Sequence, residues 1–397
     1  MTNPFLARVA APPIGQAALW AKSYDGRNGP LIDLSQAVPG NPPPPDMLAK
    51  LAEASGSPDC ARYGPILGDV ALREIYAAHV SEVYGAPLTS GETAITAGCN
   101  QAFFVALISI AAAGDAVILP TPSYFNHTMA LDMLGIETRA LATRAEDGFL
   151  PDPAALEALI DGKVKAVALV TPNNPTGAIY PPALIAEVFA ICVKHGIRLI
   201  LDETYRDFLP ATATPPHALF AEPGWRDTLV SLYSFSKSYA IPGHRMGAIA
   251  AADGFLAEAA KVMDTVQICP PRPPQPALAW AIGATAAWRR EKTAEIIERA
   301  EIFRATLQGH PDWRIEQIGA YFAYVRHPYA GHPSAVVAEG LAREFGIVTL
   351  PGSFFGAGQD GHLRIAFANI SAERIASLGE RLHLARNLFA PLDTVEA

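Results

Sequence analysis

Length, composition and charge place this chain among globular proteins with small-molecule partners. It has 397 residues, of which 50% are hydrophobic and 17% charged, a mixture that can bury a large core and predicts two domains. The formal net charge of -9 disfavours a general affinity for nucleic acid or for anionic membranes. The four cysteines have no metal-ligand spacing, so we expect no metal and reduced thiols in a cytoplasmic protein. No run approaches a membrane span of about 20 apolar residues, and no export signal is expected at the N-terminus.

The first part of the chain, 1–45, is expected to form an N-terminal arm and part of a small domain. Its last stretch, LIDLSQAVPGNPPPPD (31–46), is rich in proline and glycine. Because proline removes a backbone donor and fixes φ, such a segment favours an extended arm over a helix or a central strand.

The central part, 46–285, is expected to form a large α/β domain. Short apolar, β-rich runs alternate there with helical stretches, and several runs are apolar at successive positions. That pattern is typical of strands covered on both faces in a mainly parallel sheet. The runs are ETAITAG (92–98), DAVILP (115–120), VKAVALVTP (164–172), IRLILDE (197–203), TLVSLYSFS (228–236) and MGAIAAA (246–252).

The last part, 286–397, is expected to form a smaller α/β domain. CPPRPPQP (269–276) precedes a strongly helical stretch over 277–307 that links the two domains. Strand-like runs at 321–327 and 362–369 and the helical pattern at 371–389 complete the smaller domain.

Polar residues directly follow several of the predicted strands. Ligand sites in such sheets gather at the carboxyl ends of the strands. Lys237 follows one of these strands; a lone lysine there is commonly a solvated surface residue, but a partly desolvated amine can attack an aldehyde. Arg245, eight residues later, can bring a fixed positive charge suited to a phosphate, and Ser234 adds a hydroxyl donor.

Asp202 ends another predicted strand, where a carboxylate can either face water or keep a pyridine nitrogen protonated. Tyr205, three residues later, can hydrogen-bond a phenolic oxygen. Asn174, in TPNNPTG, can donate to the same oxygen, although the segment is equally typical of a tight turn.

Three further features each have a ligand-binding interpretation and a purely structural one. In TAGCNQA, Gly98 precedes a long apolar helix, so the backbone N–H groups of Cys99 and Asn100 can bind a phosphate or simply start a helix. Tyr124 can stack on a planar cofactor or pack in the core. Arg364 lies on a half-buried strand and needs an anion, which is either a substrate carboxylate or a structural salt-bridge partner.

Taken together, NNPTG (173–177), DETY (202–205) and SFSKSYAIPGHRMG (234–247) resemble the class I/II aminotransferases, which are fold-type I enzymes dependent on pyridoxal 5′-phosphate (PLP). YGPILGDVALRE (63–74) and HLRIAFAN (362–369) support the resemblance, which covers almost the whole chain.

The resemblance implies a function for each of these residues. Lys237 is expected to hold PLP as a Schiff base and to shuttle a proton while an amino group moves from an α-amino acid to a 2-oxo acid through aldimine and ketimine intermediates. The remaining cofactor contacts implied by the family are Asp202 at the pyridine nitrogen, Asn174 and Tyr205 at the phenolic oxygen, Tyr124 stacked on the ring, and Gly98, Cys99, Asn100, Ser234 and Arg245 at the phosphate.

The resemblance also implies a shared site in a homodimer. Tyr63 matches a tyrosine that reaches the phosphate in the neighbouring subunit, and Arg364 matches the residue that binds the substrate α-carboxylate. The chain departs from many relatives by having Cys99 and Asn100 in the phosphate loop. Arg272 falls in a segment that relatives bring toward the partner's pocket; it either recognises a second anionic group or is a solvent-facing loop arginine.

Two other functions use parts of the same pattern. A PLP-dependent lyase, decarboxylase or synthase has the same pocket, because the cofactor stabilises a carbanion in each case. A non-catalytic PLP-type ligand sensor has the same fold, but such regulators carry a DNA-binding segment for which we expect no room here. The pattern leaves the amino donor and the oxo-acid acceptor open.

Overall fold

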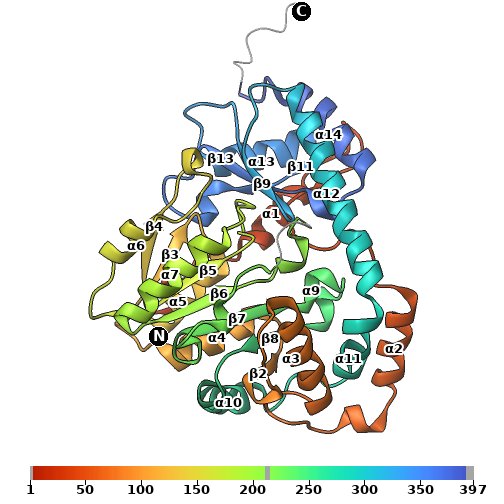
Figure 1. Ribbon diagram of the computed structural model, residues 1–397. Helices are drawn as coiled ribbons and strands as arrows, with labels where there is room; N and C mark the ends of the chain where they lie inside the picture. Colours follow the sequence, from red (N-terminus) through yellow and green to blue (C-terminus); the bar gives the residue numbers. More distant parts are fainter. Residues whose placement is uncertain (1–2, 211–214, 390–397) are drawn as a thin grey trace, which may run out of the picture. The chain divides into compact units, whose positions relative to one another are not determined.

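The computed structural model describes residues 3–210 and 215–389, and the chain divides into two compact units (Figure 1). The first unit comprises the residues up to Val9, Asn41–Asn174 and Ala178–Glu295. The second comprises Ala10–Gly40, Pro175–Gly177 and the residues from Ile296 onward. The domain boundaries expected at 45 and 285 stay predictions.

A large mixed sheet forms the centre of the first unit. Within the described residues it has seven strands in the order β2-β8-β7-β6-β5-β3-β4. The pairs from β7 through β4 are parallel, whereas β8 runs antiparallel to both β7 and β2. The strands are β2 Thr93–Thr96, β3 Ala116–Thr121, β4 Glu137–Ala142, β5 Val164–Val170, β6 Arg198–Asp202, β7 Leu229–Ser234 and β8 Gly247–Ala250.

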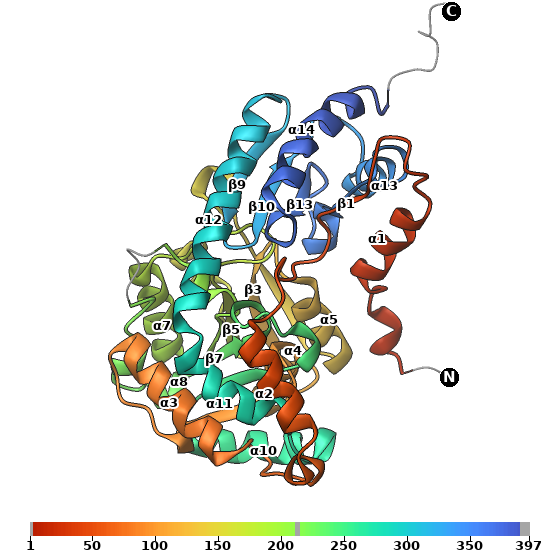
Figure 2. The same cartoon turned by 90° about the vertical axis from the view of Figure 1, so that its right-hand side faces the viewer.

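The central strands are buried on both faces because helices pack on each side of the sheet. Every residue of β7 and four of the five in β6 are buried, which explains why these runs are apolar without alternation. Figure 2 shows α7 on one side of the strands and α4 and α5 on the other. The longer helices of this unit are α2 Pro45–Ser55, α3 Val70–Tyr84, α4 Cys99–Ile110, α5 Phe125–Leu134, α7 Pro182–His195, α10 Asp253–Gln267 and α11 Pro274–Ala284.

Helix α4 lies over the middle of the sheet and carries much of the core. Its Phe103, Ala106 and Leu107 are at most 1% exposed and belong to one apolar cluster with side chains from β6, β7 and β8 and from α10. Burial of the larger side chains, Phe103 and Leu107, contributes about 1.5–3 kcal/mol each. The N-terminus of α4 is therefore held firmly at one edge of the sheet.

The second unit is built on an antiparallel sheet in the order β12-β13-β10-β9 and a parallel pair, β1 with β11. Arg364 of β13 lies opposite Tyr324 of β10 and Leu350 of β12. The elements are α1 Pro13–Lys22, β1 Ile32–Asp33, β9 Arg314–Gly319, β10 Phe322–Arg326, α13 Ser334–Phe345, β11 Ile347–Val348, β12 Leu350–Pro351, β13 His362–Ala366 and α14 Ala372–Ala385.

Short segments and one long helix complete the chain. Helix α12, Ala286–Gln308, begins in the first unit and continues in the second. The short helices are α6 Pro153–Ala158, α8 Trp225–Thr228 and α9 Phe235–Ser238. The 3-10 turns are Leu6–Arg8, Pro58–Ala61, Ser90–Glu92, Ala145–Asp147, Arg206–Phe208, Leu219–Ala221, Pro242–His244, Gly352–Phe355 and Phe367–Asn369.

The predicted α/β class and the mainly parallel large sheet are confirmed, and two details differ. Strand β4 had no counterpart among the predicted runs because ETRALA is only partly apolar and lies at the sheet edge, with one buried residue. The single helical stretch predicted over 277–307 is two helices, since α11 ends at Ala284 and α12 begins at Ala286.

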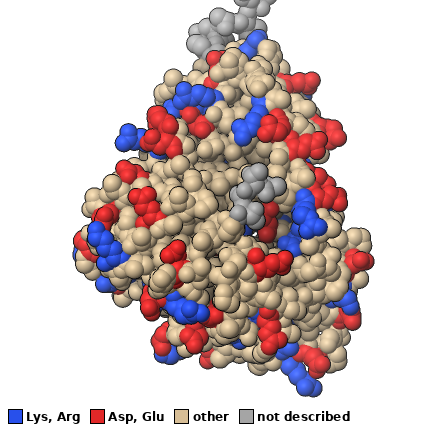
Figure 3. Space-filling model, viewed as in Figure 1, with Lys and Arg blue, Asp and Glu red and all other residues tan. Residues whose placement is uncertain are grey.

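The surface carries both signs of charge. On the face drawn in Figure 3, lysine and arginine side chains are interspersed with aspartate and glutamate. Across residues 3–210 and 215–389, none of the helices combines the length and apolarity that a membrane crossing requires.

Candidate active site

Lys237 lies directly after the buried strand β7, in the short helix α9. The hydroxyl of Ser234 accepts a hydrogen bond from the backbone N–H of Ser236, with an O–N distance of 3.3 Å, and so ends the strand and starts the helix. Ser236 is buried, whereas Lys237 is half-buried. The Lys237 Nζ lies 5.9 Å from the ring centroid of Tyr205, which follows the neighbouring strand β6. The two parallel strands thus bring these residues together at their carboxyl ends.

Asp202, the last residue of β6, is 5% exposed and is held by three donors. Its Oδ1 accepts from the Thr204 backbone N–H at 3.0 Å and from the Cys99 thiol at 3.5 Å. Its Oδ2 lies 3.3 Å from His127 Nε2. Burial by itself raises the pKa of Asp202, but the hydrogen bond and charge of His127 and the Thr204 contacts outweigh it, so the net pKa is lowered. The carboxylate is therefore anionic although buried.

His127 was not singled out from the sequence, yet it contacts the central carboxylate. It is 2% exposed and stacks on Phe103, with ring centroids 3.8 Å apart. Tyr124, three residues earlier in the chain, meets the His127 ring edge-on at 5.3 Å. The spacing of three residues at the start of a helix was the available signal, because it places both side chains on one face.

The turn before α4 and the turn before β8 form a cradle. Gly98 has φ +87°, and a Cβ at that residue would lie 2.2 Å from Nη2 of Arg245. A Cβ at Gly247 would lie 2.7 Å from the backbone nitrogen of Cys99. Only glycine permits this close approach of a guanidinium to the first turn of a helix. Backbone N–H groups and a fixed cation at one point match the chemistry of a phosphate.

Asn174 follows β5 and is 5% exposed. The adjacent Asn173 donates from its backbone N–H to the Ala178 carbonyl at 2.8 Å and from its side chain to the Tyr180 hydroxyl at 3.3 Å. The tight-turn interpretation is thus correct for the backbone. Asn174 remains a buried amide at the same carboxyl edge as Tyr205, which is 4% exposed.

The other predicted cofactor residues also lie at this edge. Tyr124 is half-buried at the start of α5, with its ring 4.9 Å from that of Phe125. Asn100 is exposed on the first turn of α4. The predicted cofactor contacts that follow β5, β6 and β7, or that begin α4 and α5, therefore lie along one edge of the sheet.

Arg364 lies in the second unit and is 2% exposed. Its Nη2 donates to the carbonyl of Ser35. The guanidinium also lies over the rings of Phe322 and Phe355, at 5.1 Å and 5.3 Å from their centroids. Aromatic faces and a carbonyl stabilise a buried cation, and a guanidinium has the planar donor geometry that suits a carboxylate.

Tyr63 and Arg272 differ in their surroundings. Tyr63 is 77% exposed, which is unusual for a large aromatic side chain. Arg272 forms an ion pair with Asp69, with Nε 3.1 Å from Oδ1, and its Nη1 donates to the Arg62 carbonyl at 3.3 Å. In this chain Arg272 is thus engaged with protein groups.

A buried polar network behind the site was also missed from the sequence. Glu203, 1% exposed, accepts from the Tyr84 hydroxyl at 2.5 Å and from the Ser231 hydroxyl at 2.8 Å. His217 Nε2 lies 3.4 Å from its Oε1, and Arg206 donates to the Tyr84 hydroxyl at 3.1 Å. Successive residues at a strand end point to opposite faces. Glu203 therefore anchors from behind the segment that presents its neighbours to the site.

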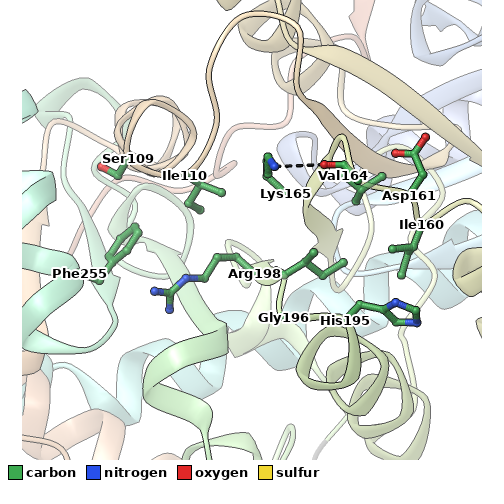
Figure 4. A pocket seen from close by; sticks show the side chains of 12 residues that line it. Ser109, Ile110, Ile160, Asp161, Val164, Lys165, His195, Gly196, Arg198 and Phe255 are labelled. Atoms are coloured by element: carbon green, nitrogen blue, oxygen red, sulfur yellow. Dashed lines mark hydrogen bonds between the residues drawn. The ribbon is translucent and has the colours of Figure 1, made fainter.

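A cavity of about 560 Å³ lies at the opposite edge of the large sheet (Figure 4). It is lined by residues at the amino ends of β5 and β6, where ligand sites of such sheets are not expected. Its basic side chains are engaged with protein groups: Lys165 lies 3.7 Å from Asp115, and Arg198 lies over the Phe255 ring at 5.5 Å. This cavity is therefore not the candidate site.

The described part of the chain offers no cluster of side chains that could bind a metal ion. Within residues 3–210 and 215–389, no group of three or more histidine, cysteine, aspartate or glutamate side chains is arranged to hold a metal ion.

Comparisons with known proteins identify the family of the chain. The family model for aminotransferase class I and II matches residues 30–382. The chain is 30% identical to the aromatic aminotransferase ISS1 of Arabidopsis thaliana, with 88% of each chain covered, and 27% identical to an aspartate/prephenate aminotransferase of Thermus thermophilus, with 94% and 96% covered. A substrate-bound structure of BacF from Bacillus subtilis superposes with a TM-score of 0.88 at 25% identity, covering 97% of each chain.

The Glu203 network predicts an acid-dependent stability. Burial alone raises the pKa of Glu203, but the nearby His217 and Arg206 outweigh it and the net pKa is lowered. A carboxylate whose pKa is lower in the folded state stabilises the fold above its unfolded value, about 4.3, and loses that contribution as the pH falls through the folded value.

We therefore expect Glu203→Gln to destabilise the protein by on the order of 2 kcal/mol at pH 7 and by less at pH 4. Thermal unfolding of wild type and variant across this range measures the difference. Glu258→Gln, which changes an exposed carboxylate on α10, is the matched control and should have no comparable effect. A loss of stability that is the same at both pH values would contradict the assignment.

Proposed function

The chain belongs to the class I and II aminotransferase family, and from that premise we propose that Lys237 carries PLP covalently at the carboxyl edge of the large sheet. The protein is an aminotransferase that uses an amino acid and a keto acid. The observation that carries the proposal is the position of Lys237 Nζ over the Tyr205 ring, one strand away from the buried anionic Asp202.

The residues at this edge fit PLP. When bound, the cofactor supplies an aldehyde for the amino group and a protonated ring that accepts electrons from the substrate's α-carbon. The glycine cradle beside Arg245 leaves room and donors for a phosphate, as the Cβ positions at Gly98 and Gly247 indicate. Asp202 is an anionic acceptor for a ring N–H, and a carboxylate has about four acceptor positions, of which the protein donors do not fill all.

Each residue of the chain has a distinct task in this proposal. The amine of Lys237 would move a proton from the α-carbon of the amino acid. Asp202 keeps the proton on the ring nitrogen. Asn174 and Tyr205 donate hydrogen bonds to the phenolic oxygen, and Tyr124 covers one face of the ring.

The phosphate is bound by the first turn of α4 together with basic and hydroxyl side chains. The backbone N–H groups of Cys99 and Asn100 are donors at the positive end of a 12-residue helix. Arg245 supplies the charge and Ser234 a hydroxyl.

We further propose that the enzyme is a cytoplasmic homodimer in which Tyr63 contacts the phosphate of the partner subunit's cofactor. The 77% exposure of Tyr63 supports an intermolecular contact, because burying an aromatic ring at an interface is favourable. The unpaired cysteines are consistent with a reducing compartment. Arg272 pairs with Asp69, so a second anionic group on the substrate would have to replace Asp69 in order to bind Arg272.

The amino-donor half-reaction tests the proposed function. Purified protein loaded with PLP and mixed with single amino acids should convert the cofactor to its amine form and release the matching 2-oxo acid in equal amount. The named activities of relatives put aromatic amino acids and aspartate first in the panel. Release of CO₂, or of pyruvate with ammonia, without the amine form of the cofactor would instead indicate a decarboxylase or lyase. No spectral change with any donor would favour a ligand sensor.

Arg364 is proposed to bind the substrate α-carboxylate. Arg364→Ala should lower kcat/KM for α-amino acids on the order of 100-fold, because a buried carboxylate loses its charged partner. Amines without a carboxylate should be unaffected. Arg326→Ala, which removes an exposed arginine from the neighbouring strand, is the control. An equal fall for amino acids and amines would show that Arg364 is structural.

A further inference from the structure

Cys99 holds a position that its assumed task at the phosphate does not explain. It is the first residue of α4 and is 8% exposed. Its backbone nitrogen lies in the glycine cradle, but its side chain points elsewhere: Sγ is 3.5 Å from Asp202 Oδ1. That distance is within the range of a hydrogen bond to or from sulfur, which is longer than one between nitrogen and oxygen.

The thiol at this position is the protonated form. Burial, reinforced by the negative charge of Asp202, raises the pKa of Cys99 well above its usual value. An S–H group next to a carboxylate can only be the donor, because an ionised carboxylate only accepts. The direction of the hydrogen bond follows: Cys99 donates and Asp202 accepts.

Asp202 is thus fixed from three separate elements. Cys99 comes from α4, His127 from α5, and Thr204 from the chain after β6. Two of the donors occupy Oδ1, whereas His127 is at Oδ2. A carboxylate rotates about one bond, so donors on both oxygens determine its plane and leave the remaining acceptor position of Oδ2 pointing in one direction.

We propose that Cys99 is a positioning residue for transamination, whose thiol orients the Asp202 carboxylate toward the cofactor's ring nitrogen. The proposal rests on the proposed function of Asp202. Cys99 would then contribute to both ends of the cofactor site: its backbone N–H lies at the phosphate position, and its side chain contacts Asp202, the proposed partner of the ring nitrogen. The alternative is that the sulfur only fills space beneath the sheet edge.

The S–H stretching band in the infrared spectrum of the full-length enzyme tests the hydrogen bond itself, independently of activity. The S–H band that disappears from the spectrum of the Cys99→Ser variant is assigned to Cys99. The band should lie at lower frequency than that of Cys192, a fully buried thiol in α7, and should move toward it in Asp202→Asn. A Cys99 band that coincides with that of Cys192 and ignores Asp202→Asn would overturn the proposal.

Cofactor affinity separates positioning from packing. The dissociation constant of PLP is measured by titrating protein from which the cofactor has been removed. Cys99→Ala should weaken binding about fivefold, the equivalent of one modest hydrogen bond. Cys99→Ser, which keeps a donor in a smaller side chain, should restore the affinity to within about twofold of wild type.

A matched control distinguishes this effect from loss of a buried sulfur. Cys192→Ala removes the same atom from another buried site and should lower the melting temperature without changing PLP affinity. Equal weakening by Cys99→Ala and Cys99→Ser, or none by either, would contradict the positioning role. If wild-type protein itself fails to bind PLP, the proposed function fails; if it binds PLP and only the Cys99 predictions fail, the proposed function stands.

Discussion

The site depends on keeping one buried carboxylate ionised. An isolated charge at a 5% exposed position is costly, and burial alone drives the pKa of Asp202 upward. The protein offsets this cost with donors from helices α4 and α5 and from the chain after β6. Because those donors must converge on two oxygen atoms, the positions of both helix starts relative to the strand are constrained.

The strand order makes this convergence possible. Strands β5, β6 and β7 are parallel neighbours, so the residues that follow them lie at one edge, and Lys237 meets the Tyr205 ring there. Because β8 runs antiparallel to β7, its amino end lies at the same edge, and Arg245, just before β8, packs there against Gly98. A cation, an anion and an amine are thereby supplied to one place by elements that are distant in sequence.

The sequence was sufficient for the fold class and for residues that follow apolar strands, since hydrophobic runs and strand ends are local signals. It was insufficient for His127 and Glu203, whose roles arise from contacts with Asp202 and Tyr84 that only the folded chain brings together. The Cys99 side chain was overlooked for the same reason: its neighbours suggested a phosphate loop, whereas its thiol contacts a residue on another strand.

Lys237 is the lysine proposed to bind the cofactor. Borohydride reduction of the PLP-loaded enzyme makes the lysine–cofactor bond permanent, and peptide mass mapping then locates it. We expect one reduced cofactor per chain, on the peptide that contains Lys237, with labelling abolished in Lys237→Ala. Stoichiometric labelling of any other lysine, or labelling that persists in Lys237→Ala, would contradict it.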